Sequence, residues 1–331
     1  MFMNWGEKKV LVTGAGGFIG SHLAERLVSK GAAVRAWVHY NSRGEPGLLK
    51  FLPADTLKGI EVFAGDLLNP HTALKALEGC QMVFHLGALI SIPYSYVHPD
   101  EVVHTNLLGT LNILMAARKT GIEKVIHTST SEVYGTARYA PINEEHPLQA
   151  QSPYAASKIG ADKLAESFYR SFELPVVIVR PFNTYGPRQS ARAVIPTIIT
   201  QALVNKKVFL GNLQTSRDFT FVSDTVEGFI KAGETDGIIG MTFNLGSGQE
   251  IRIADLAGLI IQKIDPTVEL VTEPQRLRPP NSEVYRLISD HSLASKVLGW
   301  QPVISLSEGI EATIAWIKAH LSLYQVGKYE F

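Results

Sequence analysis

The chain has 331 residues, enough to bury a sizeable core and to form about two domains. Its 31 Lys and Arg residues balance 31 Asp and Glu residues, which leaves no electrostatic basis for binding nucleic acid or a membrane surface. The lone Cys80 excludes an intramolecular disulfide and a cysteine metal cluster, and no run reaches the roughly 18 apolar residues of a membrane span. We therefore expect a soluble, cytoplasmic α/β protein that binds no metal, nucleic acid or membrane.

The first predicted elements are a strand over residues 9–13, a glycine-rich turn over 14–20 and a helix that ends near Gly31. Glycines in this context let the backbone turn tightly and approach a pyrophosphate, which then sits on the N–H groups of the helix. An ordinary glycine-rich turn is the alternative, but the flanking elements favour dinucleotide binding. The predicted contacts here are Gly14, Gly17, Phe18 and Ile19.

A second strand, over residues 33–38, ends where an acidic side chain would bind the adenosine ribose of NAD. Val38 occupies that place, and Arg43 follows in a polar segment. Without a carboxylate to repel a 2′-phosphate, NADP is permitted alongside NAD, although these residues could equally form a plain polar loop. The predicted cofactor contacts are His39, Asn41, Ser42 and Arg43.

Two further strand-and-helix units begin with buried runs over residues 61–65 and 82–86. Small residues after the second run would let the backbone lie along a dinucleotide. His85 lies within an apolar strand and is interpreted as a core histidine, not a catalytic one. The helical segment 106–117 is apolar on most of its circumference, so either the sheet or a partner subunit should cover it. The predicted cofactor contacts in these units are Asp66, Leu67, Leu86, Gly87 and Ala88.

The stretch from Thr128 to Lys158 carries the predicted chemistry. A buried strand over residues 124–127 places hydroxyls and a carboxylate at its carboxyl end, where open α/β sheets bind ligands. A helix then begins with Ser152 as its cap and Pro153 in its first turn, and its residues 154 and 158 share one face. We expect four side chains to converge on one small molecule: Thr130, Glu132, Tyr154 and Lys158.

Alternating strands and helices predict a doubly wound parallel sheet, and the alternation fades after the strand over residues 175–180. Later strands are expected at 217–222 and 242–246, and later helices at 255–264 and 307–321. The predicted division is a nucleotide-binding domain, 1–180 with 220–247, and a smaller substrate-binding lobe, 181–219 with 248–331.

Four motifs together resemble the extended short-chain dehydrogenase/reductases that act on nucleotide sugars, and the resemblance covers nearly the whole chain. The motifs are Gly14-x-x-Gly17-x-x-Gly20, Tyr154-x-x-x-Lys158, Asn183-x-Tyr185-Gly186-Pro187-Arg188 and Arg217-Asp218-Phe219. The resemblance implies a Rossmann domain holding NAD or NADP, tightly bound and recycled, a C-terminal lobe holding a nucleoside diphosphate, and a homodimer formed through a helix bundle. It also implies that Lys158 binds the nicotinamide ribose and that Tyr154 is the acid/base.

Substrate contacts are expected in the smaller lobe. Arginine forks match phosphate oxygens, so the basic loop around Arg278 and the strand at Arg217 are suited to a sugar nucleotide's diphosphate. Solvated surface arginines are the alternative. The full predicted set is Asn183, Arg188, Arg217, Arg278 and Glu283.

The segment Thr130-Ser131-Glu132 resembles that of nucleotide-sugar 4,6-dehydratases, which carry an acid at the Glu132 position where simple 4-epimerases carry none. The resemblance implies that Glu132 removes the C5 proton as the 6-hydroxyl leaves. Ser131 stands at the position where the similar dTDP-glucose 4,6-dehydratases have Asp. The resemblance therefore implies that Glu132 or a water would protonate the leaving hydroxyl. Residues 188–196 most resemble dehydratases of the legionaminic acid route, which implies UDP- or GDP-N-acetylglucosamine as substrate.

Three alternatives stay open: a 4-epimerase, a UDP-glucuronate decarboxylase and a non-enzymatic nucleotide sensor. The segments 130–135 and 183–188 also resemble those of the decarboxylases. The decarboxylases, however, have the motif Tyr-x-x-Gly-Lys-Arg at the position where this chain has Tyr154-Ala-Ala-Ser-Lys158-Ile159. A sensor would have no need for an intact Tyr154 and Lys158 pair.

Overall fold

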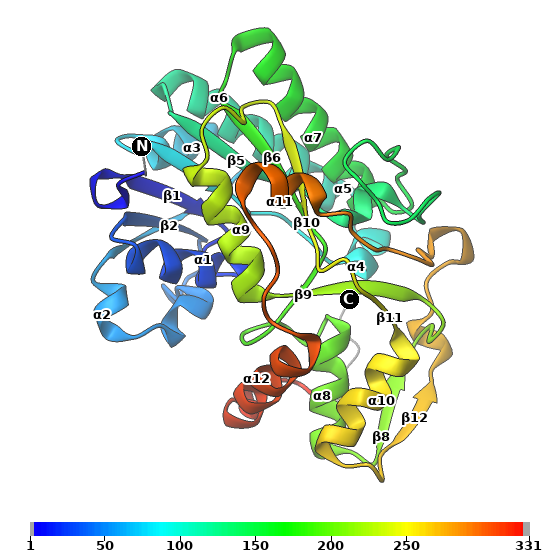
Figure 1. Cartoon of the computed structure of the whole chain (residues 1–331). Coiled ribbons are helices and arrows are strands. Elements are labelled where there is room, and N and C mark those ends of the chain that lie inside the picture. The colour runs from blue at the N-terminus through cyan, green and yellow to red at the C-terminus, as the bar shows by residue number, and fades with distance from the viewer. Residues whose placement is uncertain (1–2, 327–331) are drawn as a thin grey trace.

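The computed structural model describes residues 3–326, and its centre is a seven-stranded parallel sheet (Figure 1). The strand order β10-β6-β5-β4-β1-β2-β3 confirms the predicted doubly wound Rossmann-type fold. The strands are β1 (Lys9–Thr13), β2 (Ala33–His39), β3 (Ile60–Gly65), β4 (Met82–His85), β5 (Lys124–Thr128), β6 (Val176–Pro181) and β10 (Thr242–Leu245).

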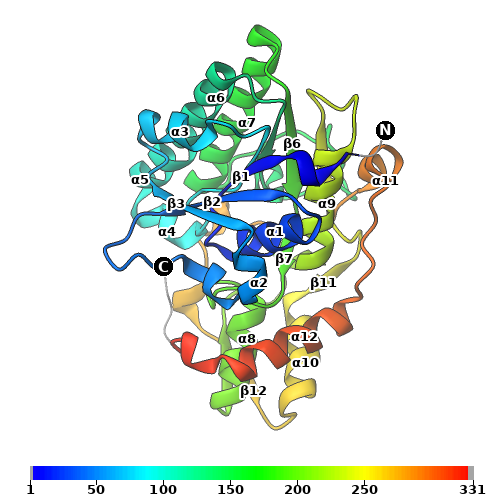
Figure 2. The same ribbon diagram turned by 90° about the vertical axis from the view of Figure 1, so that its left-hand side faces the viewer.

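Helices cover both faces of the sheet, and each face has its own apolar core (Figure 2). On one face lie α1 (Phe18–Ser29), α9 (Val222–Glu234) and α11 (Ser292–Leu298); on the other lie α3 (Pro70–Leu77), α6 (Gly109–Thr120) and α7 (Pro153–Phe172). The shorter helices are η1 (Trp5–Glu7), η2 (Gly47–Phe51), α2 (Ala54–Leu57), α4 (Ile92–Val97), α5 (Pro99–Val103), the π-helical η3 (His104–Leu108), η4 (Ser131–Tyr134), η5 (Pro274–Arg276), η6 (Pro280–Ser282) and η7 (Leu321–Leu323).

The order of the strands fixes where a ligand can bind. β1 pairs with β2 on one side and with β4 on the other, so the chain connections diverge between β1 and β4. A crevice outside the carboxyl ends of the strands forms at such a switch point. The loops after β1, β4 and β5 therefore converge at one edge of the sheet.

A smaller lobe with its own core lies beyond this edge (Figure 1). It contains the sheet of β7 (Asn183–Tyr185), β9 (Ser216–Phe221) and β11 (Glu250–Arg252), and the pair β8 (Lys207–Leu210) and β12 (Glu269–Thr272). Its helices are α8 (Val194–Val204), α10 (Ile253–Ile264) and α12 (Leu306–Ala319), the last starting at a capping box of Ser305 and Glu308.

One segment differs from the predicted division of the chain. Residues 292–300 were assigned to the smaller lobe, but Ala294, Leu298 and Trp300 are buried in the core beneath α9. Trp300 Nε1 also donates to the carbonyl oxygen of Asp224 at 2.8 Å. The chain therefore returns to the large sheet at α11, where the sheet's core covers the apolar face of this helix. It then goes back to the smaller lobe at α12. The rest of the division stays a prediction.

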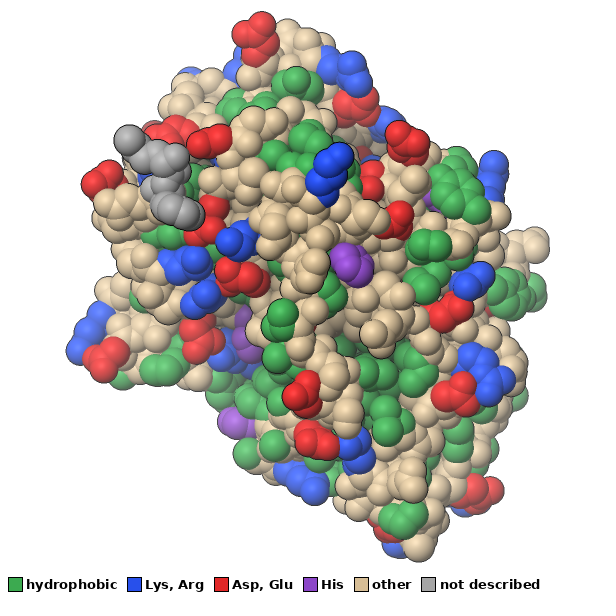
Figure 3. Space-filling view, viewed as in Figure 1, with side chains coloured by type: hydrophobic (Ala, Val, Ile, Leu, Met, Phe, Trp, Pro, Cys, Tyr) green, Lys and Arg blue, Asp and Glu red, His purple; other side chains and the backbone are tan. Residues whose placement is uncertain are grey.

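The predicted helix 106–117 is α6, preceded by the π-helical η3. Ile113 and Leu114 are buried against the sheet, whereas Leu108 and Met115 are 42% and 56% exposed. The sheet thus covers one side and leaves an apolar stripe outside. Between residues 3 and 326, no helix is long and apolar enough to cross a membrane. Figure 3 shows acidic and basic side chains interspersed over one face of the molecule.

Candidate active site

The turn after β1 forms a cradle that only small residues permit. Gly14 has a φ of +68°, and a Cβ on it would lie 2.9 Å from the backbone of Gly87. A Cβ on Gly20 would lie 2.2 Å from the carbonyl oxygen of Gly14. Gly17 is the N-cap of α1 and makes no side-chain hydrogen bond to the first turn, whose N–H groups begin at Phe18 and Ile19. These features fit a dinucleotide's pyrophosphate on the helix N-terminus.

The loop after β4 is fixed to this cradle by buried hydrogen bonds. Thr13 Oγ1 accepts from the N–H of Gly87 at 2.9 Å and lies 2.8 Å from His85 Nδ1. Thr110 donates its hydroxyl to a backbone carbonyl, so it accepts from His85 Nε2 at 3.1 Å. Burial, and then the charges of His127 and Lys158, hold the pKa of His85 well below its usual value. His85 is a core histidine, as predicted, and it orients the loop that carries Leu86, Gly87 and Ala88.

Asn106 is a positioning residue that the sequence analysis missed. It is buried, accepts from the N–H of Leu89 at 2.7 Å, and donates to the carbonyl of Leu89 and to Ser157 Oγ, each at 2.9 Å. It therefore ties the β4 loop to α7. The signal that could have identified it is an amide side chain within an otherwise apolar helical run.

The loop after β2 is exposed, and the side chains of His39 and Asn41 bond within it. His39 Nδ1 lies 2.9 Å from the carbonyl of Tyr40, and Asn41 Oδ1 accepts from the N–H groups of Arg43 and Glu45. Asn41 thus shapes the turn that displays Ser42 and Arg43.

The predicted adenine rim follows β3. Asp66 accepts from the N–H of Leu68 at 2.9 Å, and Leu67 lies directly against Gly87 and Gly109. All these residues lie along the predicted cofactor edge, and their contacts with a cofactor stay predictions.

Tyr154 and Lys158 occupy the first turns of α7, which begins as predicted with Ser152 accepting from the N–H of Ala155 and with Pro153 in the first turn. Lys158 Nζ donates to the carbonyl oxygen of Thr128 at 2.7 Å. Thr130 lies close enough to the Tyr154 hydroxyl to lower the pKa of Tyr154 through hydrogen bonding. Thr130, Tyr154 and Lys158 therefore meet at the carboxyl end of β5.

Burial sets the charge state of this pair. It raises the pKa of Tyr154, an effect that the Thr130 hydrogen bond opposes, and it lowers the pKa of Lys158 to about 8. Lys158 is then mostly charged at neutral pH, where its ammonium can stabilise a Tyr154 phenolate. The arrangement suits a tyrosine that takes and returns a hydroxyl proton.

Glu132 lies in the short helix η4, whose cap is Thr130: its Oγ1 accepts from the N–H of Glu132 at 3.2 Å. Glu132 and Ser131 are both buried. One carboxylate oxygen of Glu132 lies 3.9 Å from Arg278 Nη1. The charge of this buried acid also raises the pKa of Tyr154, and its carboxylate faces Arg278 of the smaller lobe.

From the smaller lobe, Arg217 and Glu283 complete the cluster, with Nη2 and Oε1 3.9 Å apart and both side chains buried. Two buried donors, Asn183 Nδ2 and Arg278 Nη1, make no hydrogen bond to the described residues 3–326. Buried donors are nearly always paired, so a ligand that brings acceptor oxygens would satisfy them.

Arg188 is placed elsewhere. Its Nη2 donates to Glu25 Oε2 at 2.6 Å and its Nη1 to Ser21 Oγ at 3.4 Å, both on α1. His22 Nε2 lies 3.0 Å from the carbonyl of Pro187. Arg188 has a positive φ of 68°, which the tight turn after Gly186 imposes. The structure therefore brings Arg188 to α1, not to Arg217 and Arg278, and its predicted substrate contact stays untested.

Comparisons with known proteins agree with this geometry. Residues 11–313 match the protein-family model described as GDP-mannose 4,6 dehydratase. The chain is 34% identical to UDP-glucose 4-epimerase of Mycolicibacterium smegmatis (94% of this chain, 98% of the relative) and 33% identical to mouse dTDP-D-glucose 4,6-dehydratase (94% and 89%). Among solved structures it is similar to DesIV, a dTDP-glucose 4,6-dehydratase from Streptomyces venezuelae with NAD and DAU bound, with a TM-score of 0.85, 27% identity and 96% and 98% coverage.

Proposed function

Because the chain belongs to the GDP-mannose 4,6-dehydratase family of nucleotide-sugar dehydratases and epimerases, we propose that it is a nucleotide-sugar 4,6-dehydratase. The observation that carries the proposal is the buried Glu132, capped by Thr130 next to Tyr154. Interconversion at C4 needs only a base for the 4-hydroxyl, which Tyr154 supplies. A second buried acid beside it suits the additional proton removal at C5 that a dehydration requires.

The proposed cofactor is NAD, held on the first turn of α1 by the Gly14 cradle and at its nicotinamide ribose by Lys158. NAD is bound in the similar DesIV structure. When bound, the nicotinamide would supply an acceptor for the C4 hydride and a donor of that hydride to C6, so the cofactor would be recycled. Mass spectrometry of the nucleotide extracted from the purified protein tests the assignment, since NADP would carry one additional phosphate.

The proton balance assigns a task to each side chain. Tyr154 takes the proton of the 4-hydroxyl as C4 is oxidised to the ketone, which makes the C5 proton acidic. Glu132 takes the C5 proton and gives a proton to the departing 6-hydroxyl, which leaves as water. The two protons removed equal the two needed: the C5 proton passes through Glu132 to the departing hydroxyl, and the O4 proton held by Tyr154 restores C5 when the hydride reaches C6. The product is the 4-keto-6-deoxy sugar.

The diphosphate of the substrate would be held by Arg217 and Arg278, with Asn183 as a further donor. Arginine forks bind phosphate oxygens in pairs of charge-assisted hydrogen bonds. We propose an N-acetylglucosamine nucleotide, with UDP or GDP, as the first substrate to examine.

A panel assay tests the reaction. The enzyme is incubated with UDP-, GDP- and dTDP-linked glucose and N-acetylglucosamine, and the expected product has lost one water by mass spectrometry. A product of unchanged mass with inverted C4 would replace the proposal with a 4-epimerase, the activity named for the M. smegmatis relative. Loss of carbon dioxide from UDP-glucuronate would replace it with a decarboxylase.

A further inference from the structure

A buried ion pair of Asp162 and Arg180, which has no task in the proposed chemistry, lies behind Lys158. Asp162 follows Lys158 by one turn of α7 and is 2% exposed. Its Oδ2 accepts from Arg180 Nη2 at 2.9 Å, from Arg180 Nε at 3.2 Å and from Ser129 Oγ at 2.8 Å. A carboxylate with three donors on one oxygen is held in a fixed place.

These contacts join α7 to the strand end that carries the site. Lys158 holds the carbonyl of Thr128, and Asp162, one turn on, holds the hydroxyl of Ser129, the next residue of the same strand end. Thr130 follows directly. One turn of α7 therefore fixes the last residue of β5 and the residue that follows it, and the positions of Lys158 and Thr130 depend on both contacts.

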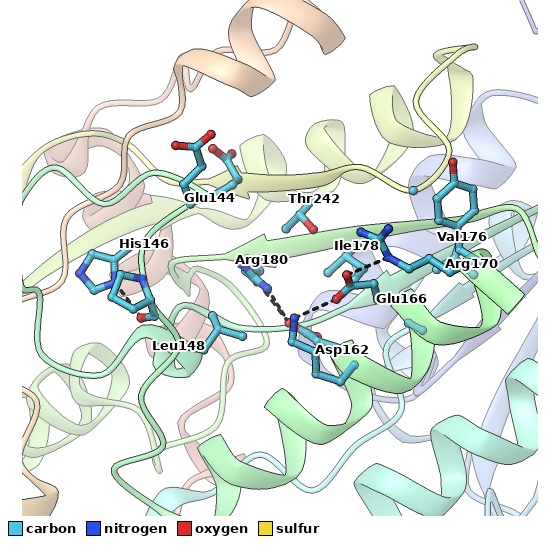
Figure 4. A pocket seen from close by; sticks show the side chains of 16 residues that line it. Glu144, His146, Leu148, Asp162, Glu166, Arg170, Val176, Ile178, Arg180 and Thr242 are labelled. Carbon is cyan, nitrogen blue, oxygen red and sulfur yellow. Dashed lines mark hydrogen bonds and ion pairs between the residues drawn. The ribbon is translucent and has the colours of Figure 1, made fainter.

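Asp162 is itself supported from the other side. Arg180, on β6, donates through Nη1 to the hydroxyl of Tyr134 at 2.9 Å, and that hydroxyl donates to Asn244 Oδ1 on β10 at 2.8 Å. Figure 4 shows Arg180 and Asp162 in contact at the wall of a cavity of about 330 Å³, which the C-terminal half of α7 lines together with Glu144 and His146. Lys158 and Tyr154 do not line this cavity. Asp162 thus separates it from the candidate active site.

The charges around Lys158 give Asp162 a second effect. Burial alone would raise the pKa of Asp162, but His127, Arg180 and Lys158 lower it to about 2, so the carboxylate stays ionised. The other groups facing Lys158 are Tyr154 on α7, His127 on β5 and His85 on β4, and burial keeps both histidines neutral. The negative charge of Asp162 opposes the burial that lowers the pKa of Lys158.

We propose that Asp162 is a positioning residue: anchored by Ser129 and Arg180, it fixes the turn of α7 that carries Lys158 and places a negative charge one turn from the Lys158 ammonium. The inference rests on the proposed function, in which Lys158 binds the nicotinamide ribose and stabilises the Tyr154 phenolate.

The test compares Asp162→Asn with wild-type enzyme carrying its co-purified nucleotide. The protonation of Lys158 is followed by NMR of ¹³C-lysine-labelled protein, with the signal assigned by its loss in Lys158→Met. Removing the charge should increase the acid dissociation constant of Lys158 about tenfold, one pKa unit. Glu166→Gln is the matched control, because Glu166 lies one turn further along α7, lines the same cavity and pairs with Lys163 and Arg170. A Lys158 titration that is unchanged in Asp162→Asn overturns the proposal.

Ser129→Ala separates anchoring from charge, because it removes one hydrogen bond to Asp162 and keeps the carboxylate. We expect kcat to fall about threefold to tenfold at unchanged KM, since Ser129 contacts Asp162 and not the substrate. The alkaline limb of the pH–rate profile should stay in place in Ser129→Ala and move to lower pH in Asp162→Asn. If Asp162→Asn does not fold, an unchanged kcat in Ser129→Ala overturns the proposal. The NMR measurement needs no nucleotide sugar, so it still decides this inference if the proposed dehydratase activity is absent.

Discussion

Glu132 and Tyr154 belong to different elements, η4 and α7, yet the hydrogen bond of Thr130 to Tyr154 and its capping of Glu132 place them side by side. Their proposed tasks act on neighbouring atoms of one sugar, O4 and C5. Because the tasks occur in sequence, removing one side chain should stop the reaction at a defined point.

Glu132→Gln should block dehydration and still permit oxidation at C4. The amide keeps the shape of the side chain but cannot take the C5 proton, so reduced nicotinamide should accumulate instead of being consumed. Stopped-flow absorbance of the reduced cofactor measures this accumulation, and mass spectrometry should show a loss of dehydrated product of about 10²-fold to 10⁴-fold. Equal loss of C4 oxidation and of dehydration would indicate that Glu132 maintains the structure of the site and does not take the C5 proton.

Tyr154→Phe should suppress both steps, because no base remains for the 4-hydroxyl. General-base catalysis contributes about 10²-fold to 10⁴-fold, and a loss of that order is expected in the rate at which reduced nicotinamide appears. Retention of the co-purified nucleotide serves as the control for folding, since the Gly14 cradle is untouched. Rapid oxidation at C4 in this variant would contradict the assigned role.

At this scale the sequence pointed to Thr130, Glu132, Tyr154 and Lys158 because strand ends and helical spacing follow from local patterns. It did not point to Ser129, Asp162 or Asn106 as positioning residues. Their roles arise from contacts between positions far apart in the chain, such as Asn106 with Ser157 and Ser129 with Asp162. Hydrophobic periodicity carries no information about such pairs.

At the scale of elements, the buried strands were predicted almost to the residue, because continuous apolar runs bounded by turn residues leave few alternatives. β1 and β5 are two of these. The short helices α4 and α5 and the strand pair β8 and β12 were not predicted, because a few residues give too short a pattern. The motif associates Arg188 with the substrate, a contact that stays a prediction, and the turn at Gly186 and Pro187 places its side chain against α1.

The contact between Arg188 and Glu25 should contribute to the free energy of unfolding by linking α1 to the smaller lobe. A double-mutant cycle of Arg188→Ala and Glu25→Ala, measured by urea unfolding, should give a coupling energy of about 1 kcal/mol, within the range for contacting charged pairs. The side chains are 10% and 33% exposed. The control is Asp55 with Lys58, whose side chains are 91% and 77% exposed and should couple by less than about 0.5 kcal/mol. Equal coupling energies in the two cycles would show that the Arg188–Glu25 contact stabilises the protein no more than an exposed ion pair does.

His22 should make the same contact sensitive to acid. Burial, and then the charge of Arg188, lower the pKa of His22 to about 4 from its usual 6.5. Between these values the unfolded chain binds a proton that the folded chain does not, so the free energy of unfolding should decrease as pH falls from 6.5 to 4. In His22→Gln this decrease should be smaller, measured by urea unfolding at several pH values. An identical decrease would mean that other groups dominate acid sensitivity.

At the scale of the whole molecule, the Rossmann-type sheet and a smaller lobe follow from the alternation of elements and its loss after β6. The first return of the chain to the sheet also lies in the predicted segment 220–247, whereas the second return does not follow from the alternation. The chain crosses to the sheet for α9 and β10 and returns there for α11, and the second crossing is marked by a single short apolar helix. The sequence pattern of such a short helix does not indicate which of the two cores the helix packs against.

We predict that the protein forms a homodimer through the outer face of η3 and α6, where Leu108 and Met115 expose an apolar stripe. Residues seven apart lie on one side of a helix, and a second copy would cover them. Met115→Glu should shift the mass measured by light scattering from dimer to monomer, because a charge at the centre of an apolar interface is left without a partner. Val303→Glu makes the same kind of change at a 77% exposed position in the loop before α12 and should leave the mass unchanged. A wild-type monomer, or a Met115→Glu protein that stays dimeric, would place the interface elsewhere or remove it.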